Sequence, residues 1–296
     1  MSTFIIEGGR RLKGEIPVGA GKNAPVALLF GALAVQGKVT FYDMSRVEEV
    51  ERVLDMFRSI GVICEWKNET TLHLDTSKDI DMSAIDVEAC RRTRVALLFF
   101  GALNGRIKQY ILPRPEGCRL GERTIGPHLH ALSRLGMTVS EHGKNFTVKS
   151  GTRASHEIVM YESGDTATEN AIMAAVRTPG TTTISFASAN YMVQDLCYFL
   201  VAAGAKIDGV GTTTLTIHGV TKLRDVSSYH IIPDPVDAMA WISLGVTTRS
   251  PLIIRNCAMD FLALELELLS LMGQSYAIEN RRRSKRTSNG CSWNAK

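Results

Sequence analysis

Four segments of this chain share one order of predicted elements, and this internal repeat limits the fold more than any other feature of the sequence. Each has an apolar helix, a turn with glycine, a β-rich strand, a second helix ending near glycine, and short strands. A supersecondary unit that recurs in this way predicts an α/β protein in which helices pack on sheets. The segments are residues 27–75, 95–150, 170–219 and 238–280. The fourth stops before its pair of short strands is complete.

The glycine that ends each second helix sets the period of the repeat. A residue in the left-handed conformation commonly follows a helix, and glycine adopts that conformation without a steric penalty. The helices before these glycines carry apolar residues at helical spacing, which is the pattern of one buried face. The four glycines, spaced 75, 68 and 69 residues apart, are Gly61, Gly136, Gly204 and Gly273.

Counting repeats predicts one three-repeat domain over residues 22–232. Residues 4–9 and 14–19 are predicted strands that precede the first repeat. A single repeat cannot bury its own sheet face. The fourth repeat is therefore expected to pair with the N-terminal strands, so that residues 1–21 and 233–280 form a partial second domain.

The basic balance of the chain comes from its last sixteen residues. The formal net charge is +4, but residues 281–296 hold six Lys and Arg and no acidic residue, which leaves 28 basic against 30 acidic residues before them. Global charge thus gives no support to nucleic-acid binding. The tail has no apolar period, and we expect either a disordered tail or an out-of-frame product.

The lack of a recognisable targeting signal and the spacing of the cysteines indicate a cytoplasmic protein. The N-terminus has no basic, apolar and small-residue succession typical of a signal peptide, and no apolar run is long enough to span a membrane. The six cysteines are scattered without CxxC or close Cys/His spacing. This pattern favours reduced thiols and no metal site.

The segment around Lys22 is a candidate anion site. Gly19, Gly21, Lys22 and Asn23 lie between a predicted strand and a predicted helix. Glycine permits close backbone approach, and a helix N-terminus attracts phosphate or carboxylate. The spacing does not match a nucleotide P-loop. A tight turn with a solvated lysine is the alternative.

The cluster Arg91, Arg92 and Arg94 opens the apolar helix of the second repeat. Cations are unfavourable at a helix N-terminus, so these residues either contact an anion or form a solvated edge.

Cys118 lies in a long predicted loop. It is flanked by Gly117 and Arg119, and Arg123 is nearby. Positive surroundings lower a thiol pKa and raise its reactivity, whereas an inert loop thiol is the alternative.

Residues 163–170 precede or begin the third repeat's helix and are small and polar. They suit either a backbone-lined ligand contact or a plain helix cap. The seven histidines show no HxxxH or HExxH pairing, and no Ser/His/Asp arrangement can be argued from their order.

Together these motifs resemble the UDP-N-acetylglucosamine 1-carboxyvinyltransferases, a family of enolpyruvyl transferases. The resemblance rests on GGxxLKGE followed by KNA, on the LP…GC…GxR loop and on ATENAIMAA, over about residues 3 to 280. It implies an inside-out α/β barrel-like fold of repeated βαβαββ units, with two domains of three repeats and the ligands between them. On that pattern the second domain of this chain is incomplete.

The resemblance also implies roles for individual residues. Lys22 and Asn23 would contact phosphoenolpyruvate, and Arg94 the sugar nucleotide or its phosphates. Cys118 would act in proton donation or product release and be alkylated by fosfomycin. The remaining matches are Arg123 and Ile125 on the uridine side, and Asp234 at the domain crossover.

The implied reaction is transfer of the enolpyruvyl group to the 3′-hydroxyl of UDP-N-acetylglucosamine in peptidoglycan precursor synthesis, with no cofactor or metal. Two polyanionic substrates explain the need for Lys and Arg. Two departures weaken this match: Glu162 stands where the family has a cation, and two repeats are missing. The alternative is an inactive homologue that binds a nucleotide sugar or a partner protein.

Overall fold

The computed structural model describes residues 3–115 and 124–278. The chain divides into two compact units. Unit 2 is residues 22–231, and unit 1 combines residues 1–21 with residues 232–296. Each unit is described by itself below.

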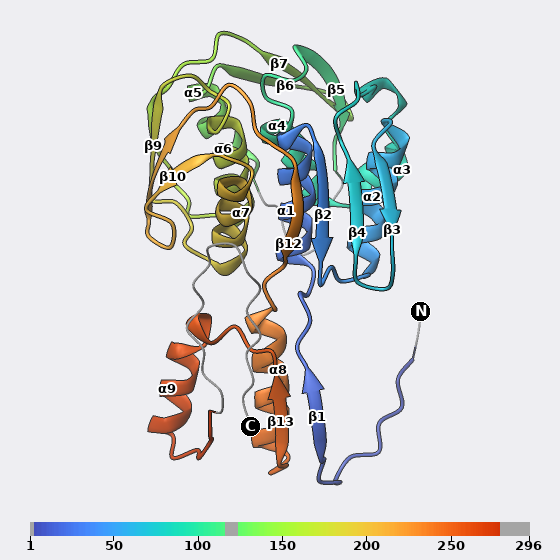
Figure 1. The fold of residues 1–296 in the computed structure, drawn as a ribbon, viewed down its shortest axis with the longest axis vertical. Coiled ribbons are helices and arrows are strands. Elements are labelled where there is room, and N and C mark those ends of the chain that lie inside the picture. Colours follow the sequence, from blue (N-terminus) through green and yellow to red (C-terminus); the bar gives the residue numbers. More distant parts are fainter. Residues whose placement is uncertain (1–2, 116–123, 279–296) are drawn as a thin grey trace. The chain divides into compact units, whose positions relative to one another are not determined.

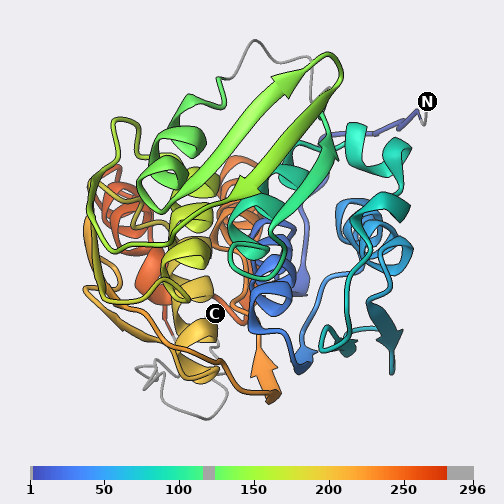
Figure 2. The same cartoon turned by 90° about the horizontal axis from the view of Figure 1, so that it is seen from above.

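Unit 2 contains the first three repeats, and helices α1, α4, α6 and α7 pack together in its middle with sheets around them, while α2 and α3 lie at its edge (Figures 1 and 2). The helices are α1 (Asn23–Val35), α2 (Glu48–Ser59), α3 (Val87–Arg91), α4 (Phe99–Ala102), α5 (Gly126–Arg134), α6 (Asp165–Ala175) and α7 (Tyr191–Ala202), with 3-10 turns η1 (Met82–Ala84) and η2 (Arg94–Leu98). The strands are β2 (Lys38–Tyr42), β3 (Ile63–Trp66), β4 (Leu72–Asp75), β5 (Gln109–Pro113), β6 (Met137–His142), β7 (Asn145–Ser150), β8 (Glu157–Val159), β9 (Thr181–Ser185), β10 (Lys206–Asp208), β11 (Thr214–His218) and β12 (Val226–His230).

The sheets of the first and third repeats have the same topology. Their strand orders are β12–β2–β4–β3 and β8–β9–β11–β10, with a parallel first pair and antiparallel pairs after it. The second repeat forms the antiparallel sheet β5–β7–β6. Strand β12, the last of unit 2, therefore completes the sheet of the first repeat. The described sheets remain separate and form no closed barrel.

A second feature of the repeats is a residue with positive φ directly after the strand that is second in the sheet order given above. Asp43 after β2, Phe186 after β9 and Asn256 in unit 1 have φ values of 62°, 58° and 60°. Asparagine and aspartate tolerate this conformation, but a bulky aromatic residue is an outlier there. The first, third and fourth repeats therefore share this backbone geometry even where their residues differ, whereas Arg114 after β5 of the second repeat does not adopt it.

Helix α1 forms the centre of the hydrophobic core. Every residue from Ala24 to Val35 is buried, because the helix is apolar on all sides. The ring of Phe30 packs edge-on against Phe57 and Phe99, at centroid distances of 5.3 and 4.9 Å. Each of these rings comes from a different helical segment, so the cluster joins the first and second repeats.

The first helices of the three repeats run parallel. Asn170 of α6 contacts Leu97 and Gly101, and Ala174, one turn later, accepts a hydrogen bond from Asn104. Phe30 of α1 packs against Phe99, and further along the helix Leu33 accepts a hydrogen bond from Arg106. The starts of α1, η2 and α6 consequently lie at one end of unit 2.

Unit 1 consists of β1 (Gly14–Pro17), α8 (Pro235–Thr247), β13 (Leu252–Arg255), the 3-10 turn η3 (Met259–Phe261) and α9 (Ala263–Leu271). Strand β1 pairs in parallel with β13, as the sequence predicts for the fourth repeat. The strand predicted over residues 4–9 is wrong, since these residues form no strand and Phe4, Ile5 and Ile6 are exposed. An extended segment needs a partner edge, and the described residues offer it none.

The length and apolar character of a helix decide whether it could span a membrane. Among the described residues, no helix combines the length and the apolar character that crossing a bilayer requires.

We expect Gly101→Ala to destabilise unit 2 by about 2 kcal/mol, because an added methyl group would overpack a helix contact. A Cβ atom on Gly101 would lie 2.3 Å from the carbonyl oxygen of Asn170 and 2.7 Å from its side-chain oxygen. Urea denaturation of both proteins measures the change. Gly164→Ala is the matched control, since its nearest new contact is 3.5 Å. Equal midpoints for wild type and Gly101→Ala would show that these helices separate freely.

Candidate substrate site

The starts of three parallel helices form the candidate site. Lys22 directly precedes α1, Arg94 is the first residue of η2, and Gly164 directly precedes α6. The first amide groups of a helix have no partner within it, and the helix dipole places partial positive charge there. Three such ends on one side of unit 2 create a positive region that favours anions.

The start of α1 is open for a ligand. Lys22 makes no side-chain cap, and the first turn contains no acidic residue. The amides of Asn23 and Ala24 are therefore unpaired by the helix, and Pro25 has no N–H to add. Lys22 and Asn23 are both exposed, so both side chains reach solvent at this end.

Arg94 and Arg92 have different environments, which separates the two alternatives for the arginine cluster. Arg92 forms ion pairs with Glu48 and Glu88, at 3.4 and 4.0 Å between nitrogen and oxygen. Arg94 is half-buried and donates a hydrogen bond of 2.8 Å to the carbonyl oxygen of Thr124. Arg92 therefore belongs to a charged surface, and Arg94 to the candidate site.

The contact of Arg94 with Thr124 brings two predicted site residues together. Ile125 follows Thr124, precedes α5 and is half-buried. The guanidinium of Arg94 thus lies against the turn that carries Ile125. Cys118 and Arg123, the other predicted residues of that loop, lie outside the described residues.

A buried amide holds the helices behind the site in register. The Asn170 amide nitrogen donates to Leu97 and to Nδ1 of His128, at 2.9 and 2.8 Å, and its oxygen accepts from the Gly101 amide at 2.8 Å. Burial, with a smaller contribution from Arg94, lowers the pKa of His128 to about 4. His128 is therefore neutral at pH 7 and can accept this hydrogen bond.

Glu169 lies beside this amide in α6 and is almost fully buried. Burial, together with the nearby charge of Asp165, raises the pKa of Glu169 to about 8. The carboxyl group is consequently protonated at neutral pH. A neutral Glu169 adds no negative charge there, and Asp165 is the acidic residue in the first turn of α6.

Asp234 lies in unit 1 and closes the turn that leads to Lys22. Its amide donates to the Gly19 carbonyl at 2.7 Å, and its carboxylate accepts from the Val236 amide at the start of α8. A Cβ atom on Gly21 would lie 2.0 Å from the Asp234 carboxylate, and Gly21 has a φ of 61°. Both the left-handed backbone and this close approach require glycine at position 21.

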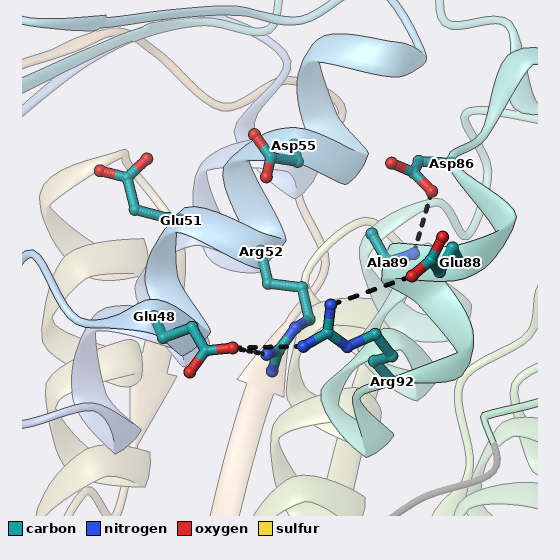
Figure 3. Close-up of a pocket in the computed structure, with 8 residues that line it drawn as sticks. All are labelled: Glu48, Glu51, Arg52, Asp55, Asp86, Glu88, Ala89 and Arg92. Carbon is teal, nitrogen blue, oxygen red and sulfur yellow. Dashed lines mark hydrogen bonds and ion pairs between the residues drawn. The ribbon is translucent and has the colours of Figure 1, made fainter. Parts of the chain in front are cut away.

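A separate cavity of about 270 Å³ lies between α2 and α3 and does not coincide with these residues. Figure 3 shows Arg92 reaching from α3 toward Glu48 across it. Five carboxylates face two guanidiniums there, so the cavity repels anionic substrates. Its lining residues are Glu48, Glu51, Arg52, Asp55, Asp86, Glu88, Ala89 and Arg92. No group of three or more His, Cys, Asp or Glu side chains in residues 3–115 and 124–278 is suited to hold a metal ion.

Sequence reasoning missed His128, Glu169 and the role of Asn170. The one sign of these residues in the sequence is that the otherwise apolar segment ATENAIMAA contains polar residues. A polar side chain buried inside an apolar helix requires a hydrogen-bond partner. His128 could not be identified as that partner, since the two residues are 42 positions apart.

The model of the EPSP synthase (3-phosphoshikimate 1-carboxyvinyltransferase) family matches residues 6–292. Among curated proteins, UDP-N-acetylglucosamine 1-carboxyvinyltransferase of Bradyrhizobium diazoefficiens is 36% identical over 259 residues, covering 88% of this chain and 59% of that protein. The protein of the same name from Deinococcus deserti is 34% identical over 273 residues, covering 92% of this chain and 64% of its own. The chain thus spans about three fifths of the length of these relatives.

Two solved structures share the fold. The enolpyruvyl transferase NikO from Streptomyces tendae matches with a TM-score of 0.81 and 24% identity, over 92% of this chain and 65% of that one. EPSP synthase from Acinetobacter baumannii matches with a TM-score of 0.73 and 16% identity, over 98% and 65%. These likenesses confirm the predicted fold class.

We expect Glu169→Gln to remove a loss of stability that occurs as the pH rises. The unfolded chain releases the Glu169 proton near pH 4.5 and the folded chain near pH 8, so the wild type loses stability between these values. The free energy of unfolding of the variant relative to wild type should rise by up to about 1.4 kcal/mol per pH unit. Urea denaturation at pH 5, 6.5 and 8 measures this difference.

The exposed Glu157, changed to Gln, provides the matched control and should show no such trend. A constant difference between Glu169→Gln and wild type across this pH range would show that Glu169 is ionised in the folded protein.

Proposed function

The chain belongs to the EPSP synthase family of carboxyvinyl transferases, and from this membership we propose that it transfers the enolpyruvyl group of phosphoenolpyruvate to the 3′-hydroxyl of UDP-N-acetylglucosamine. The acceptor is inferred from the relatives at 34–36% identity that carry this name. The reaction would serve peptidoglycan precursor synthesis.

The observation that carries the proposal is the meeting of three helix starts with Lys22 and Arg94 at one end of unit 2. Both substrates are polyanions, and they repel each other when they bind together. Cations and unpaired helix amides at one position reduce that repulsion and stabilise charge that develops during reaction.

In this proposal, Lys22 and Asn23 hold the phosphate and carboxylate of phosphoenolpyruvate at the start of α1. Arg94 binds the acceptor's phosphates from the start of η2, and Ile125 with Arg123 forms the uridine side. Asp234 positions the turn before Lys22 through its contacts with Gly19 and Gly21. Cys118 takes part in proton donation or product release.

The reaction proceeds by addition and elimination. The sugar 3′-hydroxyl attacks C2 of phosphoenolpyruvate, while C3 gains a proton and the hydroxyl loses one. The tetrahedral adduct then releases inorganic phosphate, and loss of a proton from C3 restores the enolpyruvyl double bond. Lys22 offsets the phosphate charge in both steps.

The division of the chain supports a two-domain reading. We propose that residues 22–232 form the three-repeat domain, that residues 1–21 and 233–280 form part of a second one, and that residues 281–296 belong to neither. The described cysteines, Cys64, Cys90, Cys197 and Cys257, are free thiols, which supports a reducing compartment such as the cytoplasm.

Lys22→Ala should lower phosphate release from phosphoenolpyruvate and UDP-N-acetylglucosamine by about 100-fold or more, because it removes a charge that stabilises the transition state. A coupled phosphate assay measures the rate. The exposed Lys222, changed to Ala, is the matched control and should keep the wild-type rate. Binding of UDP-N-acetylglucosamine without phosphate release in wild type would instead support an inactive nucleotide-sugar binder.

Fosfomycin should add one covalent mass to the protein, at Cys118, and should do so faster when UDP-N-acetylglucosamine is bound. The expectation follows from the electropositive sequence around this thiol. Intact-mass and peptide mass spectrometry identify the site. Cys118→Ser should remain unmodified, and an adduct at Cys64 instead would contradict a reactive Cys118.

A further inference from the structure

Three arginines gather at the end of unit 2 that lies opposite the candidate substrate site. Because the first helices of the three repeats run parallel, α1, α4 and α6 also end on one side. Arg106 follows α4 and Arg177 follows α6, whereas Arg153 lies in the segment between β7 and β8. All three side chains are half-buried. We call these three residues the arginine cluster.

Hydrogen bonds to backbone carbonyls fix Arg106 against the first repeat. Its Nη1 donates to Leu33 at 3.1 Å, and its Nη2 donates to Thr76 and Lys78 at 2.6 and 2.5 Å. Cations are favourable at helix C-termini, because the last carbonyl groups of a helix carry partial negative charge. Arg106 therefore stabilises the end of α1 and joins the first and second repeats.

Arg153 and Arg177 are each fixed through Nη1. Nη1 of Arg177 donates to the side-chain oxygen of Gln36 at 3.1 Å, and Nη1 of Arg153 donates to the Arg177 carbonyl at 2.7 Å. The Arg153 guanidinium also packs on Gly105, where an added Cβ atom would lie 2.3 Å from the same nitrogen. Gly105 directly precedes Arg106, so Arg153 contacts the chain beside Arg106 as well as that of Arg177.

The opposite edge of both guanidiniums is available to a ligand. In the described part of the chain, Nε and Nη2 of Arg153 and Arg177 make no hydrogen bond, and these atoms reach solvent. Nε and Nη2 form the side-on pair of donors that can bind two oxygens of one anion at the same time. Capping of helix ends explains the Nη1 contacts, but it leaves these two donor pairs unused.

The positive charge of the cluster is not neutralised nearby. In residues 3–115 and 124–278, none of the three arginines forms an ion pair with a carboxylate. Three helix ends, at roughly half a charge each, offset at most about half of the charge of three guanidiniums. An excess of positive charge therefore remains at this end of unit 2.

The arginines also repel one another. Burial and the nearby charge of Arg177 lower the pKa of Arg106 to about 10, and the charge of Asp79 opposes this effect. Burial and the charge of Arg153 likewise lower the pKa of Arg177. An anion bound beside these guanidiniums would reduce their repulsion.

The arrangement of donors favours a phosphate group over a carboxylate. A carboxylate has two oxygens, and a single side-on guanidinium occupies both. A phosphate group has at least three terminal oxygens and up to two negative charges, so it can accept hydrogen bonds from two guanidiniums. Arginine is also the preferred residue where phosphate is bound by planar pairs of donors.

We propose that the arginine cluster binds a phosphate group through the side-on donors of Arg153 and Arg177, with Arg106 supplying further positive charge. The ligand is free phosphate or a small phosphate ester. Because the cluster joins all three repeats, a ligand that binds there only in the folded state would stabilise unit 2. The proposal does not depend on the transferase reaction, since this site lies at the ends of the helices and the candidate substrate site at their starts.

The test uses the full chain, with inorganic phosphate and methyl phosphate as probes in two separate titrations. NMR spectroscopy follows the Nε–Hε signals of Arg153 and Arg177, which are assigned from their loss in the variants below. We expect both signals to shift to saturation, with a dissociation constant in the millimolar range or lower. The probe that binds more tightly identifies the source of the phosphate group, free or esterified.

Arg177→Gln removes one donor pair and its charge, and it should weaken phosphate binding at least tenfold, as measured from the Arg153 signal. Arg153→Lys keeps the charge but lacks the side-on pair, and it should weaken binding at least threefold, as measured from the Arg177 signal. The exposed Arg134, changed to Gln, is the matched control and should keep the wild-type affinity. Urea denaturation verifies that each variant is folded.

Lys22→Ala separates this site from the candidate substrate site, because phosphate is also a product of the proposed reaction. The variant should keep the wild-type affinity at the arginine cluster whether or not the chain has transferase activity. A failure of the proposed function would therefore leave this titration unaffected.

The absence of a saturable shift at tens of millimolar phosphate would overturn the proposal. Equal affinity of the wild type and a folded Arg177→Gln variant would also overturn it. Loss of the Arg153 response in Lys22→Ala would do the same, since the phosphate would then be bound at the candidate substrate site.

Discussion

Helix α1 is apolar on every side, and unit 2 is built around the need to remove all of those sides from water. One sheet or one neighbouring helix can cover only part of a helix. The first helices of the other two repeats therefore pack beside α1, and their own strands lie outside them. This arrangement makes the three helices parallel, and it brings their starts to one end of unit 2. The candidate site thus follows from the way the core is buried.

The repeat was visible in the sequence because it depends on local chemistry. Gly61, Gly204 and Gly273 follow their helices as predicted, and each adopts the left-handed conformation that glycine permits. The pairing of β1 with β13 was predictable for the same reason, since a lone repeat needs a second strand. The partnership of β12 with β2 was not, because nothing in a local pattern identifies a partner strand nearly 190 residues away.

The residues of the site also divide into those that follow from local sequence and those that depend on distant contacts. Lys22 and Arg94 were found from their position at predicted helix starts, and the structure places them there. The buried environment of Glu169 and the contact of Asn170 with His128 depend on packing between repeats, which composition and spacing do not encode. The strand predicted over residues 4–9 failed for a related reason. Its apolar residues Phe4, Ile5 and Ile6 are typical of a strand, but a strand forms only where a neighbouring edge exists to receive it.

The parallel pairing of β12 with β2 also determines when unit 2 can fold. The sheet of the first repeat lacks its parallel edge strand until residues 226–230 have been synthesised. A ribosome that has released only the first two repeats therefore exposes an unfinished sheet edge beside a fully apolar helix. Contacts between distant parts of a chain slow folding and lengthen the exposure of such surfaces. The late synthesis of β12 thus sets how long the edge of β2 stays without its parallel partner.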